Sequence, residues 1–347
     1  MLAQVLRSQR LVSMKPQSDE QSMGGPMAYL PTGANFKRGK ILWELGLHIA
    51  GNPETPYGGN RDMCIVVGTG AGESFKPWLK LSTGSAVMAH AVARGEITAA
   101  FVNPSAMLTQ AYRGVGLFHQ PLDLRILASY PSMDRFVIGV KQSLGFSSLH
   151  DVKRAKYPLR ISLREDPTHS TLVLIDQMLG YHGMSLAEIK SWGGSVHPIG
   201  GPGDARRIAG IRDGSLDMIL DEGISVWIDE ALGNGFVPLD LDAAAIAHLT
   251  GLGWRTGRLD HGRFSRLPAG HMCIDFSGWP LYCSASLPDA TAYEICGAFG
   301  ARHDEMPWET GTHEGIGQIG VETDATPMDV PLHAGAERWY REQGYLK

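Results

Sequence analysis

Short apolar runs of strand length alternate along the chain with segments whose apolar residues recur at helical spacing. This alternation predicts strands at 27–31, 63–68, 97–102, 124–130, 136–140, 159–163, 217–220 and 236–239, and helices at 41–50, 86–94, 106–113, 149–152, 172–179, 204–213 and 225–232. Strands that alternate with helices favour an α/β fold with mainly parallel sheets flanked by helices. The 43 glycines and 20 prolines fit the many tight turns of such a fold.

The stretch from Ser82 to Gly114 contains two polar turns, each at the start of a predicted helix. In the first turn, Thr83, Gly84 and Ser85 offer hydroxyls and backbone N–H groups. Asn103 lies in the second turn, directly after a predicted strand. Ligands of open α/β sheets bind outside the carboxyl ends of strands, against such turns. These residues are therefore candidate ligand contacts, although an ordinary strand–helix unit with helix caps has the same pattern.

A third polar turn follows the predicted strand 159–163. It begins with Arg164 and ends with His169 and Ser170 at the start of a helix. A guanidinium beside a helix N-terminus can hold a carboxylate through two parallel hydrogen bonds. Alternatively, Arg164 pairs with Asp221 or Glu222, which follow the predicted strand 217–220, and only holds the loop.

The other candidates each have a functional and a structural interpretation. His169 contacts a ligand or caps a helix, and the Asp221–Glu222 pair receives an amine, holds a metal, acts as acid and base, or pairs with Arg164. Trp279 and Trp227 pack on a ligand or in the core. His271 is a candidate for the rim of a pocket, and His182 and His197 are expected to lie on the surface.

Composition and motifs exclude several classes of protein. The formal net charge is -5 without a basic block, so no nucleic-acid partner is expected. No apolar run reaches the length of a membrane span, so no direct membrane insertion is expected. The glycine-rich turn 68–72 lacks both nucleotide-binding spacings, and no cofactor is expected. The four cysteines form no CxxC pair, and Cys64 and Cys283 are predicted to be buried thiols.

Five motifs in order give the chain a resemblance to a known family. They are Leu-Pro-Thr-Gly-Ala-Asn at 30–35, Thr-Gly-Ser at 83–85 with Gly-Glu-Ile-Thr-Ala-Ala-Phe-Val at 95–102, Ala-Tyr-Arg-Gly at 111–114, Leu-Pro-Ala-Gly at 267–270 and Pro-Leu-His-Ala-Gly-Ala-Glu-Arg-Trp-Tyr-Arg-Glu-Gln-Gly at 331–344. Together they resemble the TAXI-type solute receptors of tripartite (TRAP) transporters, which have the type II periplasmic-binding-protein fold. The likeness covers about residues 27 to 347.

The resemblance implies two α/β lobes that are joined by a hinge and close over a small organic anion. Lobe I is expected at 27–130 plus 236–347 and lobe II at 131–235, after a disordered tail at 1–26. The ligand is expected to be a small carboxylate, and the partners TRAP membrane subunits. The expected ligand contacts from lobe I are Thr32, Asn35, Thr83, Gly84, Ser85, Asn103 and Trp279, and those from lobe II are Arg164, His169, Ser170, Asp221 and Glu222.

Two features leave other functions open. The first 22 residues lack the apolar segment of a secretory signal, so the sequence as written predicts a cytoplasmic protein, or a periplasmic one if a signal precedes it. The cluster of Arg164, His169, Asp221 and Glu222 carries more ionisable groups than simple binding needs. An enzyme on the same scaffold, such as a decarboxylase of a carboxylic acid, and a cytoplasmic ligand sensor are therefore the alternatives to a receptor.

Overall fold

The computed structural model describes residues 64–67, 78–83, 86–166, 169–259, 262, 264, 266–267 and 271–347. The strand predicted at 27–31 and the helix at 41–50 lie outside the described residues, as do Thr32, Asn35, Gly84 and Ser85. None of the described helices has both the length and the apolar character needed to cross a bilayer.

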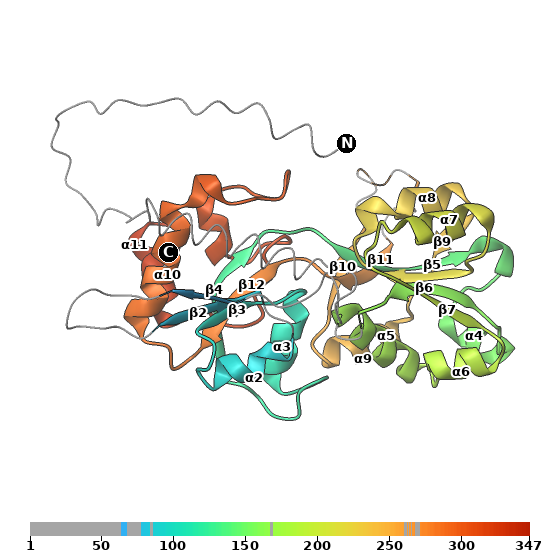
Figure 1. The fold of residues 1–347 in the computed structure, drawn as a ribbon, viewed down its shortest axis with the longest axis horizontal. Coiled ribbons are helices and arrows are strands. Elements are labelled where there is room, and N and C mark those ends of the chain that lie inside the picture. Colours follow the sequence, from blue (N-terminus) through green and yellow to red (C-terminus); the bar gives the residue numbers. More distant parts are fainter. Residues whose placement is uncertain are drawn as a thin grey trace. The chain divides into compact units, whose positions relative to one another are not determined.

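The first sheet contains five described strands in the order β1-β2-β3-β12-β4. They are β1 (Cys64–Val67), β2 (Leu79–Ser82), β3 (Ala99–Phe101), β4 (Leu124–Tyr130) and β12 (Trp279–Ser284). Only β2 and β3 pair in parallel, and β12 runs antiparallel to both of its neighbours. Strand β12, which follows every strand of the second sheet along the chain, therefore lies inside this sheet between β3 and β4 (Figure 1).

The second sheet has the order β10-β11-β5-β8-β6-β7, and β9 pairs with β5. Its strands are β5 (Arg135–Lys141), β6 (Arg160–Arg164), β7 (Ser195–Ile199), β8 (Met218–Asp221), β9 (Phe236–Pro238), β10 (Arg255–Arg258) and β11 (Met272–Asp275). Strand β6 pairs in parallel with β7 and β8, because helices connect these strands. Strands β10 and β11 form an antiparallel pair.

Two features of this topology correct the sequence-based expectation. The α/β fold with two sheets flanked by helices is confirmed, but the sheets are mixed rather than mainly parallel. Strand β5 enters the second sheet directly from β4 without a crossover helix, and it runs antiparallel to β8. The expected lobe boundary at 235 does not coincide with the division of the strands between the sheets, because β9, β10 and β11 follow residue 235 and still pair within the second sheet.

The chain crosses between the two sheets twice, and the two crossings are hydrogen-bonded to each other. The first crossing leads from Tyr130 to Arg135 and the second from Asp275 to Trp279. Phe276 N–H donates to the carbonyl of Asp134 at 3.0 Å, and the Asp134 N–H donates to the hydroxyl of Ser277 at 3.1 Å. The two crossings therefore form a paired connection of the kind a hinge requires.

An ion pair fixes the start of the second sheet at these crossings. Arg135 is buried, and its guanidinium lies 2.5 Å from the Asp275 carboxylate, with Ser277 as a further partner. Arg255 on β10 lies 2.7 Å from Asp329, which also accepts a hydrogen bond from Thr109 at 3.3 Å.

Helices cover both faces of the second sheet (Figure 1). One face carries α5 (Ser170–Tyr181), α6 (Leu186–Ser191) and α9 (Ala243–Gly251), and the other carries α7 (Ala205–Asp213) and α8 (Ile228–Gly233). The remaining helices are α2 (Met88–Ala93), α3 (Ser105–Arg113), α4 (Leu149–Ala155), α10 (Asp289–Ala301) and α11 (Ala334–Glu342). Helices α10 and α11 pack on each other and on β4 of the first sheet.

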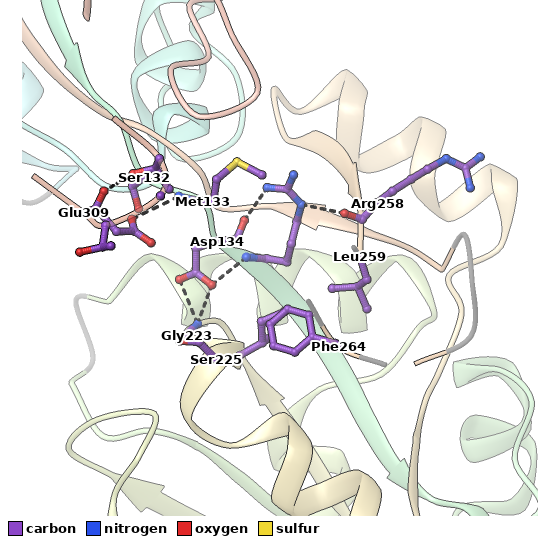
Figure 2. A pocket seen from close by; sticks show the side chains of 14 residues that line it. Ser132, Met133, Asp134, Gly223, Ser225, Arg258, Leu259, Phe264 and Glu309 are labelled. Carbon is purple, nitrogen blue, oxygen red and sulfur yellow. Dashed lines mark hydrogen bonds between the residues drawn. The ribbon is translucent and has the colours of Figure 1, made fainter. Parts of the chain in front are cut away.

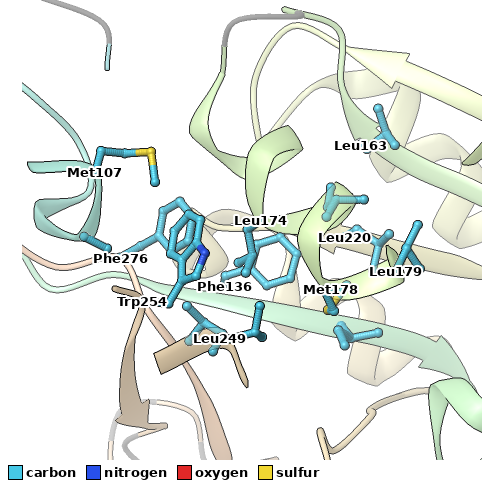
Figure 3. Close-up of a cluster of buried hydrophobic side chains, with 14 of the residues drawn as sticks. Met107, Phe136, Leu163, Leu174, Met178, Leu179, Leu220, Leu249, Trp254 and Phe276 are labelled. Atoms are coloured by element: carbon cyan, nitrogen blue, oxygen red, sulfur yellow. The ribbon is translucent and has the colours of Figure 1, made fainter. Parts of the chain in front are cut away.

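The apolar faces of α5, β6 and β8 meet in a buried cluster (Figure 3). Leu174, Met178 and Leu220 are almost completely buried there. The cluster continues to Trp254, which stacks on Phe276 with ring centroids 5.7 Å apart. Phe276 belongs to the second crossing, so this crossing is held by apolar packing as well as by hydrogen bonds.

The cysteines do not all follow the expectation. Cys283 is buried as predicted, but Cys64 is exposed, because none of the four residues of β1 is buried. All four cysteines are free thiols in the structure.

Candidate functional site

The register of β6 against β8 places two arginines opposite two aspartates. Because the strands are parallel and Ile161 pairs with Met218, Arg160 faces Asp217 and Arg164 faces Asp221. The guanidinium of Arg160 lies 2.6 Å from the Asp217 carboxylate, and that of Arg164 lies 2.9 Å from Asp221. The first pair is partly exposed and the second is buried, so β6 carries two Arg–Asp ion pairs that differ in their exposure to water.

Arg164 is the most enclosed cation among the predicted ligand contacts. Its Nε donates to Asp221, its Nη2 pairs with Glu222, and its Nη1 donates to the carbonyl of Gly200 at 3.3 Å. Only 7% of the residue is exposed. The structure therefore contains the ion pair that the sequence offered as the alternative to ligand binding, and the ligand contact itself stays a prediction.

A second buried arginine completes this cluster. Arg207 on α7 is 1% exposed, lies 2.6 Å from Asp221 and donates to the hydroxyl of Ser162 at 3.0 Å. Its guanidinium also lies over the ring of Trp227, 5.7 Å from the centroid. Trp227 is buried and its indole N–H donates to the carbonyl of Glu222 at 2.9 Å, so it supports the cluster from the core.

Asp134, from the first crossing, brings a third carboxylate to the cluster. It accepts hydrogen bonds from the backbone N–H of Arg135 at 2.7 Å and of Gly223 at 2.9 Å, and it shares a side-chain hydrogen bond with Glu222. Burial and the proximity of Asp134 raise the pKa of Glu222 to about 8. Burial is also the main cause that raises the pKa of Asp134.

The charges explain why a proton stays in this cluster. The two arginines 164 and 207 offer two positive charges, whereas Asp134, Asp221 and Glu222 offer three negative ones when all are ionised. Unbalanced charge is costly in a buried site, so one carboxyl retains its proton. Glu222, whose pKa is raised to about 8, is therefore the carboxyl that keeps its proton at neutral pH.

The backbone at Gly223 is required for this geometry. Gly223 has φ +62°, in the left-handed region, and a Cβ at this position would lie 2.8 Å from the Cβ of Pro202. Its N–H points at Asp134, as the close-up of the cavity shows (Figure 2).

His169 acts as a helix cap in the structure. Its Nδ1 accepts a hydrogen bond from the backbone N–H of Thr171 at 3.2 Å, at the start of α5, and its Nε2 lies 3.9 Å from Glu222. Burial lowers the pKa of His169, and the nearby Arg164 acts in the same direction. Ser170, the first residue of α5, is buried beside it.

A cavity of about 550 Å³ lies next to the Asp134–Gly223 contact (Figure 2). The first crossing, the turn after β8, the end of β10 and the loop 309–312 all contribute to its wall. Glu309 accepts a hydrogen bond from the Met133 N–H at 3.3 Å, which ties this loop to the crossing. The polar and apolar side chains on the wall include Ser132, Ser225, Thr310, Arg258, Leu259 and Phe264.

The remaining predicted residues lie at other places. Thr83 and Asn103 are exposed and follow the parallel strands β2 and β3, so they lie at the same edge of the first sheet. Trp279 is 40% exposed and stacks on Tyr130 with centroids 4.9 Å apart. His271 is buried, and its Nδ1 lies 2.8 Å from Asp240 rather than on the wall of this cavity.

Sequence reasoning missed Asp134 and Arg207. Asp134 carries no motif, because its role depends on the crossing that brings it beside Glu222. Arg207 is one of several charged residues on a short helix, and nothing in the local pattern marks it as the buried one. The repeated spacing was a usable signal: Arg160 and Arg164 are four residues apart, as are Asp217 and Asp221.

No family model matches the chain. Several solved structures that align with it are solute-binding proteins. The alkanesulfonate-binding protein SsuA from Xanthomonas axonopodis pv. citri, bound to MOPS, is 14% identical over 74% of this chain and 70% of its own, with a TM-score of 0.29. A ligand-free TctC solute-binding protein from Polaromonas is 13% identical, covering 64% and 70%, with a TM-score of 0.33.

The glycine betaine and L-proline-binding protein ProX from Borrelia burgdorferi is another neighbour. It is 12% identical over 64% of this chain and 74% of its own, with a TM-score of 0.33. Likeness at this level shows neither a family nor a ligand for the chain.

Proposed function

We propose that the protein is a two-lobed receptor that binds a small organic anion carrying a carboxylate. The observation that carries this proposal is the 550 Å³ cavity at the first of the two paired crossings between the sheets. A cavity of this size suits a small solute, and such sites concentrate where two structural units meet. Because the crossing residues 132–135 form part of its wall, rotation about the crossings would change the shape of the cavity.

The wall offers groups of both polarities to a solute. Arg258 is exposed and lies at the rim, where its side chain extends away from Asp134 (Figure 2). A carboxylate at the outer end of the wall can pair with Arg258, whereas the hydroxyls of Ser132 and Ser225 can donate to solute groups that lie nearer Asp134. Asp134 and Glu309 accept hydrogen bonds, so they favour a solute that also carries a hydroxyl or ammonium group.

In this proposal Arg164 does not contact the solute directly, and it acts on the cavity through Glu222 and Asp134. It pairs with Glu222, Glu222 is hydrogen-bonded to Asp134, and Asp134 lines the cavity. A second carboxylate brought close to Arg164 would have to displace Asp221 or Glu222 from a buried pair, which is costly.

A panel of small organic acids and amines tests the proposal by their effect on the melting temperature. A carboxylate at about 100 times its dissociation constant should stabilise the protein by about 2.7 kcal/mol. Arg258→Gln should weaken the best ligand by about tenfold to a hundredfold, the loss expected for one charged hydrogen bond. Arg338→Gln is the matched control, because Arg338 lies on α11 over Tyr293. Absence of any shift across the carboxylates, or equal losses in both variants, would count against the proposal.

A second candidate function is an enzyme on this scaffold, such as a decarboxylase. The raised pKa of Glu222 favours it, since a carboxyl that keeps its proton at neutral pH can act as an acid. Turnover of a bound acid that is lost in Glu222→Gln, while binding persists, would support the enzyme. A ligand recovered unchanged after long incubation supports the receptor.

The finer assignment to the TAXI type, with TRAP membrane subunits as partners, rests on the sequence motifs. A transport receptor of this type requires a periplasmic location, whereas a cytoplasmic ligand sensor does not. Cell fractionation with antibody detection separates these two, and co-purification with membrane subunits would support the transport role.

A further inference from the structure

Three side chains from the ends of three helices meet at the C-terminal end of α5, which is the end distant from Arg164. His150 lies in the first turn of α4, His182 directly follows α5, and Asp242 precedes α9. One ligand atom of each residue lies within 4.8 Å of the others. The α5 helix spans 12 residues, so this group lies about 18 Å along the helix from the Arg164 cluster.

The hydrogen bonds of His182 leave one ring nitrogen available. Its Nδ1 lies 2.8 Å from the carbonyl of Met178, and because a carbonyl only accepts, Nδ1 carries the hydrogen. The Nε2 atom then has its lone pair facing Asp242, 3.7 Å from the carboxylate. A histidine whose second nitrogen donates to a backbone carbonyl is the arrangement that metal ligands adopt, because the hydrogen bond fixes the ring.

Asp242 and His150 are placed to complete a ligand set. One carboxylate oxygen of Asp242 caps α9 by accepting from the N–H groups of Ala244 and Ala245, at 2.9 and 2.8 Å. The other oxygen lies 3.2 Å from Nε2 of His150. The ring planes of His150 and His182 meet at 61° with centroids 4.6 Å apart, so the two rings do not stack face to face.

The geometry points to a site for a zinc-type divalent ion formed by His150, His182 and Asp242. A tetrahedral zinc with bonds of about 2.0 to 2.1 Å places its ligand atoms about 3.3 to 3.4 Å apart. The distances from Asp242 to the two histidines, 3.2 and 3.7 Å, lie near that value. The third distance, between the ligand nitrogens of His150 and His182, is at most 4.8 Å, and His150 is exposed, so its side chain can move to shorten this distance. Two imidazoles and one carboxylate leave the fourth position for water.

The ion would join α9 to α4 and α5. The segment that contains α9 leads from β9 to β10, and α9 packs on α5. Metal binding at this site would therefore stabilise the segment that leads from β9 through α9 to β10, ahead of the second crossing. It does not depend on the proposed solute or on the cavity, so either proposal can fail alone.

Titration of the untagged, metal-free full chain with Zn²⁺, followed by calorimetry and by the melting temperature, tests the site. The wild type should bind one equivalent and melt several degrees higher. His150→Gln and Asp242→Asn should each lower the zinc affinity at least tenfold. Both substitutions suit the fold, since His150 is exposed and asparagine also caps helices. Co²⁺ should give a visible absorption band in the wild type that both variants lose.

Two matched controls separate this site from adventitious histidine binding. His197 is exposed and hydrogen-bonded to Ser195, and His303 lies 2.7 Å from His313 in a second histidine pair. His197→Gln and His303→Gln should leave the stoichiometric zinc site unchanged. Zinc binding that is absent in the wild type, equal in His150→Gln, or lost instead in His303→Gln would overturn the inference.

Discussion

Replacing Arg164 by methionine removes one guanidinium from a buried cluster while keeping most of the side-chain volume. In the wild type this guanidinium serves Asp221 at 2.9 Å, Glu222 and the carbonyl of Gly200. The variant retains Arg207 as a cation for Asp221, but Glu222 loses its positive partner. Because Asp221 and Glu222 are 0% and 7% exposed, water does not replace the lost charge.

The expected cost follows from the burial of the pair. Removing one partner of a buried ion pair destabilises a protein by about 3 to 5 kcal/mol, because the other charge stays buried and uncompensated. Protonation of Glu222 reduces this cost, and Arg164 is one of the groups that lowers its pKa. The loss in Arg164→Met should therefore be smaller at pH 6 than at pH 9, where more of Glu222 is ionised.

Arg160→Met is the matched control on the same strand. Arg160 pairs with Asp217 in the same register, but its side chain is 42% exposed, so its loss should cost no more than about 1 kcal/mol. Urea unfolding of both variants, followed by circular dichroism at pH 6 and pH 9, gives the comparison. The midpoint should fall further for Arg164→Met at both pH values.

Equal midpoints for the two variants would refute this reasoning. They would mean that the cluster is reached by water or that Arg164 is not paired in solution. An unchanged midpoint for Arg164→Met, together with loss of carboxylate binding, would restore the direct ligand contact predicted from the sequence.

Three further outcomes are expected. The pKa of Glu222 is raised from its usual 4.5 to about 8, so its contribution to stability is full below about pH 4.5 and is lost as the pH rises through 8. Glu222→Gln should therefore flatten the fall of the melting temperature with rising pH. An unchanged slope in this variant would place the proton on another group. Gly223→Ala should cost about 1 to 3 kcal/mol, more than Gly235→Ala, because both have positive φ but only Gly223 has a neighbour within 4 Å; denaturant midpoints that fall equally would contradict the contact with Pro202. Leu174→Ala, at a fully buried position, should cost about 2 to 5 kcal/mol in the same assay, and a cost below 1 kcal/mol would contradict the packing of α5.

Most elements between residues 97 and 239 could be predicted from the sequence because their patterns are local, but α6 and β7 were not predicted. The strand predicted at 124–130 coincides with β4, and the helix predicted at 172–179 lies within α5. That helix begins at Ser170 because His169 caps it, which apolar periodicity does not reveal. The strand at 63–68 was also predicted, but its residues are exposed in β1.

The later strands of the second sheet were missed for a physical reason. Strand β10 has the sequence Arg-Thr-Gly-Arg, without an apolar run, and it lies at the edge of the sheet. Its backbone pairing with β11 defines it as a strand, and pairing of this kind depends on tertiary structure. Without these strands the sequence predicts a lobe boundary at residue 235, although β9, β10 and β11 pair within the second sheet.

The candidate site was predictable in part. Arg164, His169, Asp221 and Glu222 do come together, as expected from parallel strands that end at one edge. The sequence left ion pair and ligand contact open because burial bears on that choice, and burial is a property of the whole fold; the structure contains the ion pairs, and ligand contact stays a prediction. Asp134 enters the cluster from a crossing between the sheets, which no local pattern encodes.

Isothermal titration with the carboxylate that gives the largest thermal shift, followed by mass spectrometry of the recovered solute, tests the receptor proposal most directly. The proposal predicts one solute bound per chain, weakened by Arg258→Gln but not by Arg338→Gln, and recovered chemically unchanged. Failure of every carboxylate in the panel to bind, or recovery of a converted product, would contradict it.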